Sequence, residues 1–200
     1  MQKKSFLIVV SVVIIFLFQF CSGEENKEVS EYYSLDSVQV ASVIPDFNLG
    51  IEFKSPQNWK KRAAEISSKV ETKGIYDGHL GQFVYEPSYL FFDDSTLSVL
   101  AMGKIVPPDS LVENSNILNL YAQALSATQK NKQEYTVDQF EKDNIRFTIF
   151  TINRANIISK RLIFQNKFND IIQFEYTTRA DAYQSEEEKI KQSIGSIGLL

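Results

Sequence analysis

Apolar and polar residues change their spacing several times along this chain, and each change marks a predicted element. An apolar run covers residues 6–20 and is broken only by Ser11 and Gln19. From residue 47 onward, short alternating segments are separated by turn residues, a pattern typical of β-strands with one buried face. Two other stretches repeat apolar residues every three or four positions and therefore predict helices, one after Pro108 and one at the C-terminal end.

Four alternating segments between residues 134 and 179 predict an antiparallel meander: EYTVDQFEK, IRFTIFTINR, IISKRLIFQ and DIIQFEYTTR. Connections of only a few residues, at 142–144 and 166–169, favour antiparallel neighbours over crossover units. We expect one face to be buried, because apolar positions alternate with polar ones. The alternating apolar residues are Ile145, Phe147 and Ile149 in the second segment and Ile172, Phe174 and Tyr176, between Gln173 and Glu175, in the fourth.

Three earlier segments predict further strands. NLGIEFKSP places Leu49, Ile51 and Phe53 on one face and ends at Pro56. QFVYEP and STLSVLAMGKIVPP follow, and the two prolines should stop the latter.

The helix after Pro108 is predicted to begin at Ser110, where Ser110 and Glu113 offer a capping box, or a turn later at Asn114. The last helix is predicted from Ser185, with Glu188 completing a capping box and Gly198 closing the end. Each has an apolar stripe at helical spacing. The stripes are Ile117, Leu120, Tyr121, Ala124, Leu125 and Thr128 in the first helix and Ile190, Ile194 and Ile197 in the second.

The N-terminal apolar run predicts export. Two lysines precede it, and it is long for the core of a signal peptide but shorter than the roughly 20 residues of a spanning helix. The segment FQFCSG resembles a bacterial lipoprotein box, in which the cysteine receives a diacylglyceryl group and cleavage occurs before it; Phe20 departs from the usual small residue at that place. We predict a signal peptide at residues 1–20 and lipidation of Cys21. Cleavage after Gly23 and an uncleaved membrane anchor are the alternatives.

Composition fits one globular domain behind this leader. After residue 20 the chain has 19 basic and 25 acidic residues, a net charge of −6 that argues against nucleic-acid binding. Cys21 is the only cysteine, so the chain cannot form an internal disulfide or a cysteine-based zinc site. Residues 21–46 begin acidic and polar and predict a lipid anchor with a tether, and residues 47–200 predict the globular domain.

Candidate residues for chemistry are few. His79 is the only histidine, which excludes a multi-histidine metal site, and a weak metal pair with Asp77 is less favoured than a turn residue facing solvent. Gly74, Gly78 and Gly81 suggest a phosphate loop but lack the following Gly-Lys-Ser/Thr, so the end of a hairpin is favoured. These residues give no reason to expect a metal or a cofactor.

Each of two charged clusters has both a functional and a structural interpretation. Asp93 and Asp94, with Glu86 nearby, could act as paired carboxylates, but in FFDDSTL they are expected to form a turn. A basic cluster could contact lipid headgroups, but a solvated patch is favoured, and the neighbouring Trp59 is expected to be buried. We therefore predict no catalytic residue. The basic cluster consists of Lys60, Lys61 and Arg62.

The order of predicted elements resembles that of the PsbP-like superfamily. The resemblance spans about residues 47–197 and is carried by a first strand leading into Pro56 and Trp59, a middle helix, four antiparallel strands, and a last helix containing Glu-Lys-Ile-x-x-Ser-Ile from Glu188 to Ile194. It implies an α+β fold, an α/β/α sandwich with a central antiparallel sheet and helices on both faces. Members of the group share no catalytic residues and are mostly binding or assembly factors.

These features together predict a noncatalytic lipoprotein of the cell envelope. It would be attached to a membrane through the lipid on Cys21 and would bind a protein partner or assist the assembly of an envelope complex. The alternative is a carrier of a small apolar ligand or lipid, which the abundance of large aromatic residues suggests. A carboxylate-based hydrolase is the third hypothesis.

Overall fold

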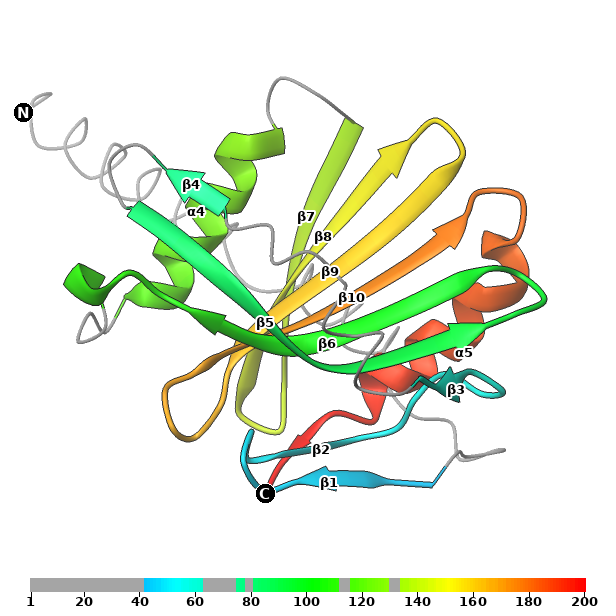
Figure 1. The fold of residues 1–200 in the computed structure, drawn as a ribbon, viewed down its shortest axis with the longest axis horizontal. Coiled ribbons are helices and arrows are strands. Elements are labelled where there is room, and N and C mark those ends of the chain that lie inside the picture. Colours follow the sequence, from blue (N-terminus) through cyan, green and yellow to red (C-terminus); the bar gives the residue numbers. More distant parts are fainter. Residues whose placement is uncertain (1–41, 63–74, 78–80, 112–115, 130–133) are drawn as a thin grey trace, which may run out of the picture.

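The computed structural model describes residues 42–62, 75–77, 81–111, 116–129 and 134–200. Within these ranges the chain forms a large antiparallel sheet, a small three-stranded sheet and two α-helices (Figure 1). This arrangement agrees with the predicted α+β class. Neither helix in the described ranges is long and apolar enough to cross a membrane. The predicted signal peptide and Cys21 lie outside the described residues.

The large sheet has eight strands, and all of its pairings are antiparallel. Its order is β3-β5-β6-β10-β9-β8-β7, with β4 paired to β5. Strands β7 to β10 match the predicted meander. β6 ends directly before the two prolines, as predicted. The bounds are β3 (Lys60–Lys61), β4 (Ile75–Asp77), β5 (Gly81–Asp93), β6 (Ser98–Val106), β7 (Glu134–Lys142), β8 (Ile145–Arg154), β9 (Ile157–Gln165) and β10 (Ile171–Arg179).

Tight turns set the antiparallel order. Only Asp143 and Asn144 connect β7 to β8, and both have positive φ angles, of 50° and 63°. Two successive positive φ angles are the requirement of a type I′ turn, whose twist matches that of the flanking strands. The loop from β8 to β9 also has two residues, and Ala155 there has a φ of 34°.

β5 is longer than the predicted segment QFVYEP because a bulge accommodates its proline. The register against β6 shifts between Pro87 and Tyr89, and Gly103 lies opposite the bulge. A Cβ atom on Gly103 would lie 2.1 Å from the backbone oxygen of Glu86, so this position on β6 needs glycine.

Two helices and the small sheet cover the large sheet. The small sheet consists of β1 (Ile44–Asp46), β2 (Ile51–Phe53) and β11 (Gly198–Leu199), in the order β1-β2-β11. α4 (Ile117–Gln129) contacts one buried cluster, and α5 (Tyr183–Gly195) contacts the other, together with β2. We call the two sides of the large sheet the α4 face and the α5 face. A 3-10 helix, η1 (Asp109–Leu111), precedes α4.

Side chains of the central strands alternate between the two clusters. Ile172 and Phe174 of β10 belong to the cluster of α5, whereas Ile171 belongs to that of α4. Successive residues of a strand point to opposite faces, so the two clusters lie on opposite sides of the sheet. Both predicted helical stripes pack inward; Ile190, Ile194 and Ile197 are all buried.

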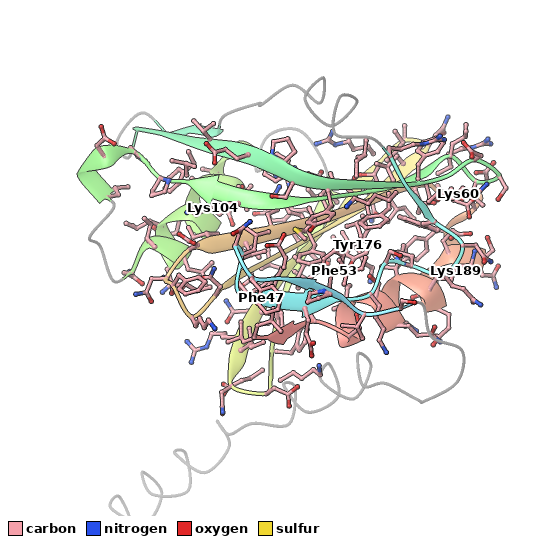
Figure 2. The ribbon with its side chains drawn as sticks, turned by 60° about the horizontal axis from the view of Figure 1, so that its bottom comes forward. Phe47, Phe53, Lys60, Lys104, Tyr176 and Lys189 are labelled. Carbon is pink, nitrogen blue, oxygen red and sulfur yellow. The ribbon has the colours of Figure 1, made fainter. Side chains whose placement is uncertain are left out.

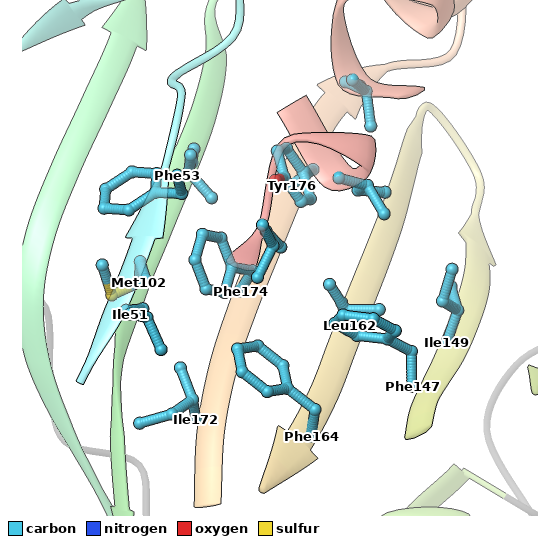
Figure 3. Packing of buried hydrophobic residues seen from close by; sticks show 14 of the residues in the cluster. Ile51, Phe53, Met102, Phe147, Ile149, Leu162, Phe164, Ile172, Phe174 and Tyr176 are labelled. Carbon is cyan, nitrogen blue, oxygen red and sulfur yellow. The ribbon is translucent and has the colours of Figure 1, made fainter. Parts of the chain in front are cut away.

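Aromatic rings fill the α5 face. Phe53 meets Phe174 edge to face at 5.3 Å between ring centroids, and Phe164 lies between Phe174 and Phe147 (Figure 3). Phe53 and Tyr176 point into the interior, whereas Phe47, 77% exposed, lies at the turn between β1 and β2 (Figure 2). Edge-to-face contacts of this kind are favourable beyond the area they bury.

Several sequence predictions need correction. The central strands of the meander are buried on both faces, since Gln173 of β10 is only 3% exposed and Thr148 of β8 only 4%, whereas the edge strand β7 is mostly exposed. The capping box at Ser185 is wrong, because α5 begins at Tyr183 after the N-cap Ala182, and the Ser185 hydroxyl donates to the Ala182 carbonyl oxygen at 2.8 Å. Gly198 begins β11 and does not close a helix.

The beginnings of two segments also differ from expectation. α4 begins at Ile117, later than Ser110 or Asn114, and residues 112–115 lie outside the described ranges. Ser110 itself belongs to η1. β1 lies within the predicted tether and pairs with β2, so the small sheet starts before residue 47.

Candidate binding site at an edge strand

β7 is the edge strand of the large sheet, and in the part of the chain that the structure describes it pairs only with β8. Lys142 and Ile145 flank the two-residue turn, so in this hairpin geometry they exchange backbone hydrogen bonds with each other. Residues of β7 that exchange backbone hydrogen bonds with β8 then alternate with residues that do not. The backbone N–H and C=O groups of four residues therefore point away from β8: Tyr135, Val137, Gln139 and Glu141.

A groove lies between α4 and the hairpin of β7 and β8, beside this edge; Figure 1 shows where these elements lie. α4 packs against β9 and β4, and Val137 and Gln139 of β7 stay exposed beside the groove. Its volume is about 560 Å³, and Phe150, which is buried, forms part of its floor. Among the residues that the structure describes, no charged one lines it. The lining residues are Asn116, Asn119, Ala122, Gln123, Ser126, Val137, Gln139, Thr148 and Phe150.

A second groove continues from the first and shares Asn116 and Asn119 with it. It has a volume of about 470 Å³ and reaches the turn from β7 to β8 and the turn from β9 to β10. Glu141 and Arg146 bring charge to this end. The other lining residues are Leu118, Asn144, Ile145, Gln165, Asn166 and Leu199.

The side-chain amide of Asn166, in the second groove, makes hydrogen bonds within the fold. The Asn166 side chain donates to the Leu49 carbonyl oxygen at 2.8 Å, and its Oδ1 accepts from the backbone N–H groups of Phe168 and Asp170 at 2.9 and 2.8 Å. Asn166 thus joins the β9–β10 turn to the small sheet. Polar side chains of the first groove also make local hydrogen bonds, from the Asn119 amide to Asn116 and from the Gln139 amide to Thr148 at 3.4 Å. An amide has both donors and an acceptor, so these groups keep capacity for the peptide groups of another chain.

The α4 face also contains a buried polar cluster. The Arg161 Nη2 group donates to both carboxylate oxygens of Glu175 at 2.9 Å, and the Tyr121 hydroxyl donates to the Gln173 side-chain oxygen at 2.6 Å. Burial opposes the charge of Arg161, but the adjacent Glu175 carboxylate outweighs it and raises the pKa of the guanidinium. Among the described residues, the buried Tyr85 hydroxyl and Arg161 Nε have no hydrogen-bond partner.

The two tyrosines of this cluster keep their protons at neutral pH. Burial is the main cause that raises the pKa of Tyr85, and the Glu175 carboxylate adds to it. Burial likewise raises the pKa of Tyr121 far above its ordinary value. Neither hydroxyl therefore acts as an acid or base near pH 7.

Asp93 and Asp94 lie at the turn between β5 and β6, as predicted. The Asp93 carboxylate accepts hydrogen bonds from the Ser95 hydroxyl at 2.5 Å, the Ser95 N–H at 2.8 Å and the Thr96 N–H at 3.4 Å. The hydrogen bond from the Ser95 hydroxyl is the main cause that lowers the pKa of Asp93. Asp94 pairs with Arg62, and Glu86 lies seven positions before Asp93 on β5, so the three acids do not converge.

Trp59 is buried in the cluster of the α5 face, as predicted. Its indole N–H donates to Glu186 Oε2 at 2.8 Å, and Lys189 donates to Glu186 Oε1 at 2.9 Å. Sequence reasoning missed Glu186 as a buried partner, because an acid in the first turn of a helix is ordinarily explained by the helix dipole. Lys60 and Lys61 form the exposed strand β3.

The end of the glycine-rich segment lies between two paired strands. β4 and β5 pair antiparallel, with Asp77 opposite Gly81, so residues 78–80 connect two paired strands. His79, Gly74 and Gly78 lie outside the described residues. Within the described ranges, no three or more His, Cys, Asp or Glu residues come together as a metal site.

Comparison with known proteins finds similarity in structure but not in sequence. No protein-family model and no curated protein matches the chain. The structure is similar to the solution structure of cyanobacterial PsbP (CyanoP) from Synechocystis sp. PCC 6803, with a TM-score of 0.48 and 14% sequence identity. The match covers 84% of this chain and 98% of that chain. A similarity at this level carries no argument about activity, partners or anchoring.

Proposed function

We propose that this chain is a noncatalytic, membrane-anchored envelope lipoprotein whose domain binds a protein partner at the groove between α4 and β7. The observation that supports binding at this place is the combination of an open strand edge with a neutral groove lined by amides and hydroxyls. Open edges tend to pair with other chains, and proteins ordinarily shorten, charge or cover them. β7 has nine residues, long enough to offer a continuous binding edge.

The anchoring part of the proposal rests on the sequence. The basic, then apolar leader ends at Cys21, and residues 21–46 lead from there to the small sheet. The net charge of −6 behind the leader would hold the domain away from an anionic membrane surface. We further propose that the domain is an α/β/α sandwich of the PsbP-like type. The close aromatic packing of the α5 face gives no support to the apolar-ligand carrier.

Photo-crosslinking in the native envelope tests the binding site. A photoreactive amino acid is placed at Gln139, which lines the groove, or at Gln184, which is equally exposed but lies on α5. The proposal predicts one protein crosslinked reproducibly from position 139 and not from position 184. Excess purified chain should compete for that crosslink, whereas a chain with Ser126→Trp, which fills the groove, should not.

Crosslinks of equal strength from both positions, or competition by the Ser126→Trp chain, would contradict the site. Mass spectrometry of the mature N-terminus tests the anchor separately. It should find a diacylglyceryl group on Cys21, and Cys21→Ser should release the chain from the membrane fraction. An unmodified Cys21 in the mature chain would refute lipidation and leave the binding site untouched.

A further inference from the structure

We infer that the partner binds as an extended polypeptide segment that adds a strand to the outer edge of β7. This inference rests on the proposed function and specifies its partner class. Open backbone groups and a side-chain pocket coincide at this edge. Val137 and Gln139 have outward-facing backbone groups and also line the groove with their side chains.

This coincidence defines how an added strand would lie. It would run about 4.8 Å from β7 and pair with the outward groups of Tyr135, Val137, Gln139 and Glu141, a stretch of about 20 Å. Residues directly opposite these four would direct their side chains to the α4 face, because paired residues share a face. They would enter the groove, whereas the alternate residues would lie over the other face.

The groove restricts what those side chains can be. Ala122 and Ser126 on α4 are small, so the helix leaves room beside the edge, and Asn119 and Gln123 supply amide groups. The described lining residues carry no charge, so they would not compensate a buried charge on the partner for its lost hydration. The segment should therefore present small or neutral polar residues to the groove.

The other face of β7 adds a charge preference. Asp138 is exposed there and is paired across the sheet with the apolar Ile149. Lys160 of β9 interacts with it electrostatically from the inner side of the sheet, and its outer side faces the open edge. Opposite charges on directly opposed residues stabilise strand pairs. We expect lysine or arginine opposite Asp138, flanked by small or neutral polar residues.

Peptide selection tests the inference and does not require the natural partner to be identified first. The full chain in detergent micelles is used to select from a phage-displayed library of random 12-residue peptides. Selected peptides are resynthesised with single backbone N-methyl groups, which remove one N–H each. Strand addition predicts an alternating pattern in which every second N-methyl group weakens binding about tenfold, while the intervening ones have little effect.

Two pairs of variants place the bound peptide. Val137→Pro removes an outward N–H and should abolish binding, whereas Val137→Ala keeps that N–H and removes only two methyl groups from the groove lining, so it should weaken binding much less. Asp138→Lys should shift the selected residue opposite it from basic to acidic. Fluorescence of Trp59, the only tryptophan, and a urea unfolding curve check that each variant is folded.

Uniform sensitivity to N-methylation, equal loss of binding in Val137→Pro and Val137→Ala, or a library that yields no binder dependent on β7 would overturn strand addition. So would a finding that residues of this chain already occupy the edge. A partner crosslinked at Gln139 together with any of these results would show that the groove binds a folded surface, which leaves the proposed function standing.

Discussion

The face of the large sheet under α5 packs aromatic rings against one another and has its polar contacts where α5 meets Trp59 and Tyr176. The face under α4 instead places hydroxyls, amides and an ion pair on the sheet strands themselves. On the α5 face, β2 and the helix enclose Phe53, Phe164 and Phe174 without a polar partner. On the α4 face, Tyr121 bonds to Gln173 and Arg161 to Glu175. Both faces bury their strands, but with different chemistry.

The difference shows where this fold gains stability and where it can bind. Closely packed rings lose much when one is removed, and they leave no room for a ligand. The α4 face is covered incompletely at its edge, where Val137 and Gln139 of β7 stay exposed beside the groove. We therefore expect stability to depend chiefly on the α5 face and binding on the α4 side of the edge strand.

The largest expected effect is on the α5 face. Phe174→Ala removes a fully buried ring that contacts Phe53, Phe164 and Tyr176, and it should lower the free energy of unfolding by about 3–5 kcal/mol. Val137→Ala, at an exposed position in the groove, should change it by less than about 0.5 kcal/mol. Urea unfolding followed by circular dichroism measures both, and similar losses would remove the contrast between the faces.

The second-largest expected loss of stability is at the ion pair of the α4 face. Arg161→Met leaves the mostly buried Glu175 carboxylate without its partner and should lower the free energy of unfolding by about 2–3 kcal/mol. Adding Glu175→Leu should recover the stability to within about 1 kcal/mol of the original chain, because the uncompensated charge is then gone. A double variant as unstable as the single one would show that the pair itself, and not the stranded charge, matters.

Two tyrosines on the α4 face allow a comparison in which the same substitution removes a hydrogen-bonded hydroxyl or one without a partner among the described residues. Tyr121→Phe leaves the Gln173 side-chain oxygen without its donor and should cost about 1–2 kcal/mol. Tyr85→Phe removes a buried hydroxyl that has no hydrogen-bond partner among the described residues, so it should be neutral or slightly stabilising. Thermal unfolding of the two variants side by side distinguishes them; a clear loss in Tyr85→Phe would reveal a partner for that hydroxyl.

The smallest effect is an acid response at the β5–β6 turn. Hydrogen bonds from Ser95 lower the pKa of Asp93 in the folded chain relative to about 3.9 in the unfolded chain. The ionised group therefore stabilises the fold above the unfolded pKa, and this contribution disappears as the pH falls through the folded pKa. Asp93→Asn should be about 1 kcal/mol less stable at pH 7 and should approach the original chain in acid. A difference that is constant with pH would contradict this.

Much of the fold follows from local pattern. The four meander strands were predicted almost residue for residue, because alternation and two-residue turns are encoded within each segment. The burial of Gln173 and Thr148 was not predicted, because it depends on α4, which belongs to a different segment of the chain. The extension of β5 past Pro87 depends on Gly103 in a different strand, and β11 depends on pairing with β2.

The candidate site was missed for a similar reason. Each groove residue is ordinary in its own segment, and an edge strand is defined only by the order of the whole sheet. One signal was present, because Asn116, Asn119, Gln123 and Ser126 follow one another at spacings of three and four and form a polar stripe beside the buried one. Such a stripe of short, uncharged side chains differs from the charged exterior that most helices present.

Residue-resolved hydrogen exchange of β7 tests the open edge most directly. Without a partner, the amides of Tyr135, Val137, Gln139 and Glu141 should exchange rapidly, while the intervening amides, which pair with β8, should be protected. Addition of a selected peptide should protect those same four amides. Four amides that are already slow in the free chain, or that stay fast when the peptide is bound, would contradict strand addition at β7.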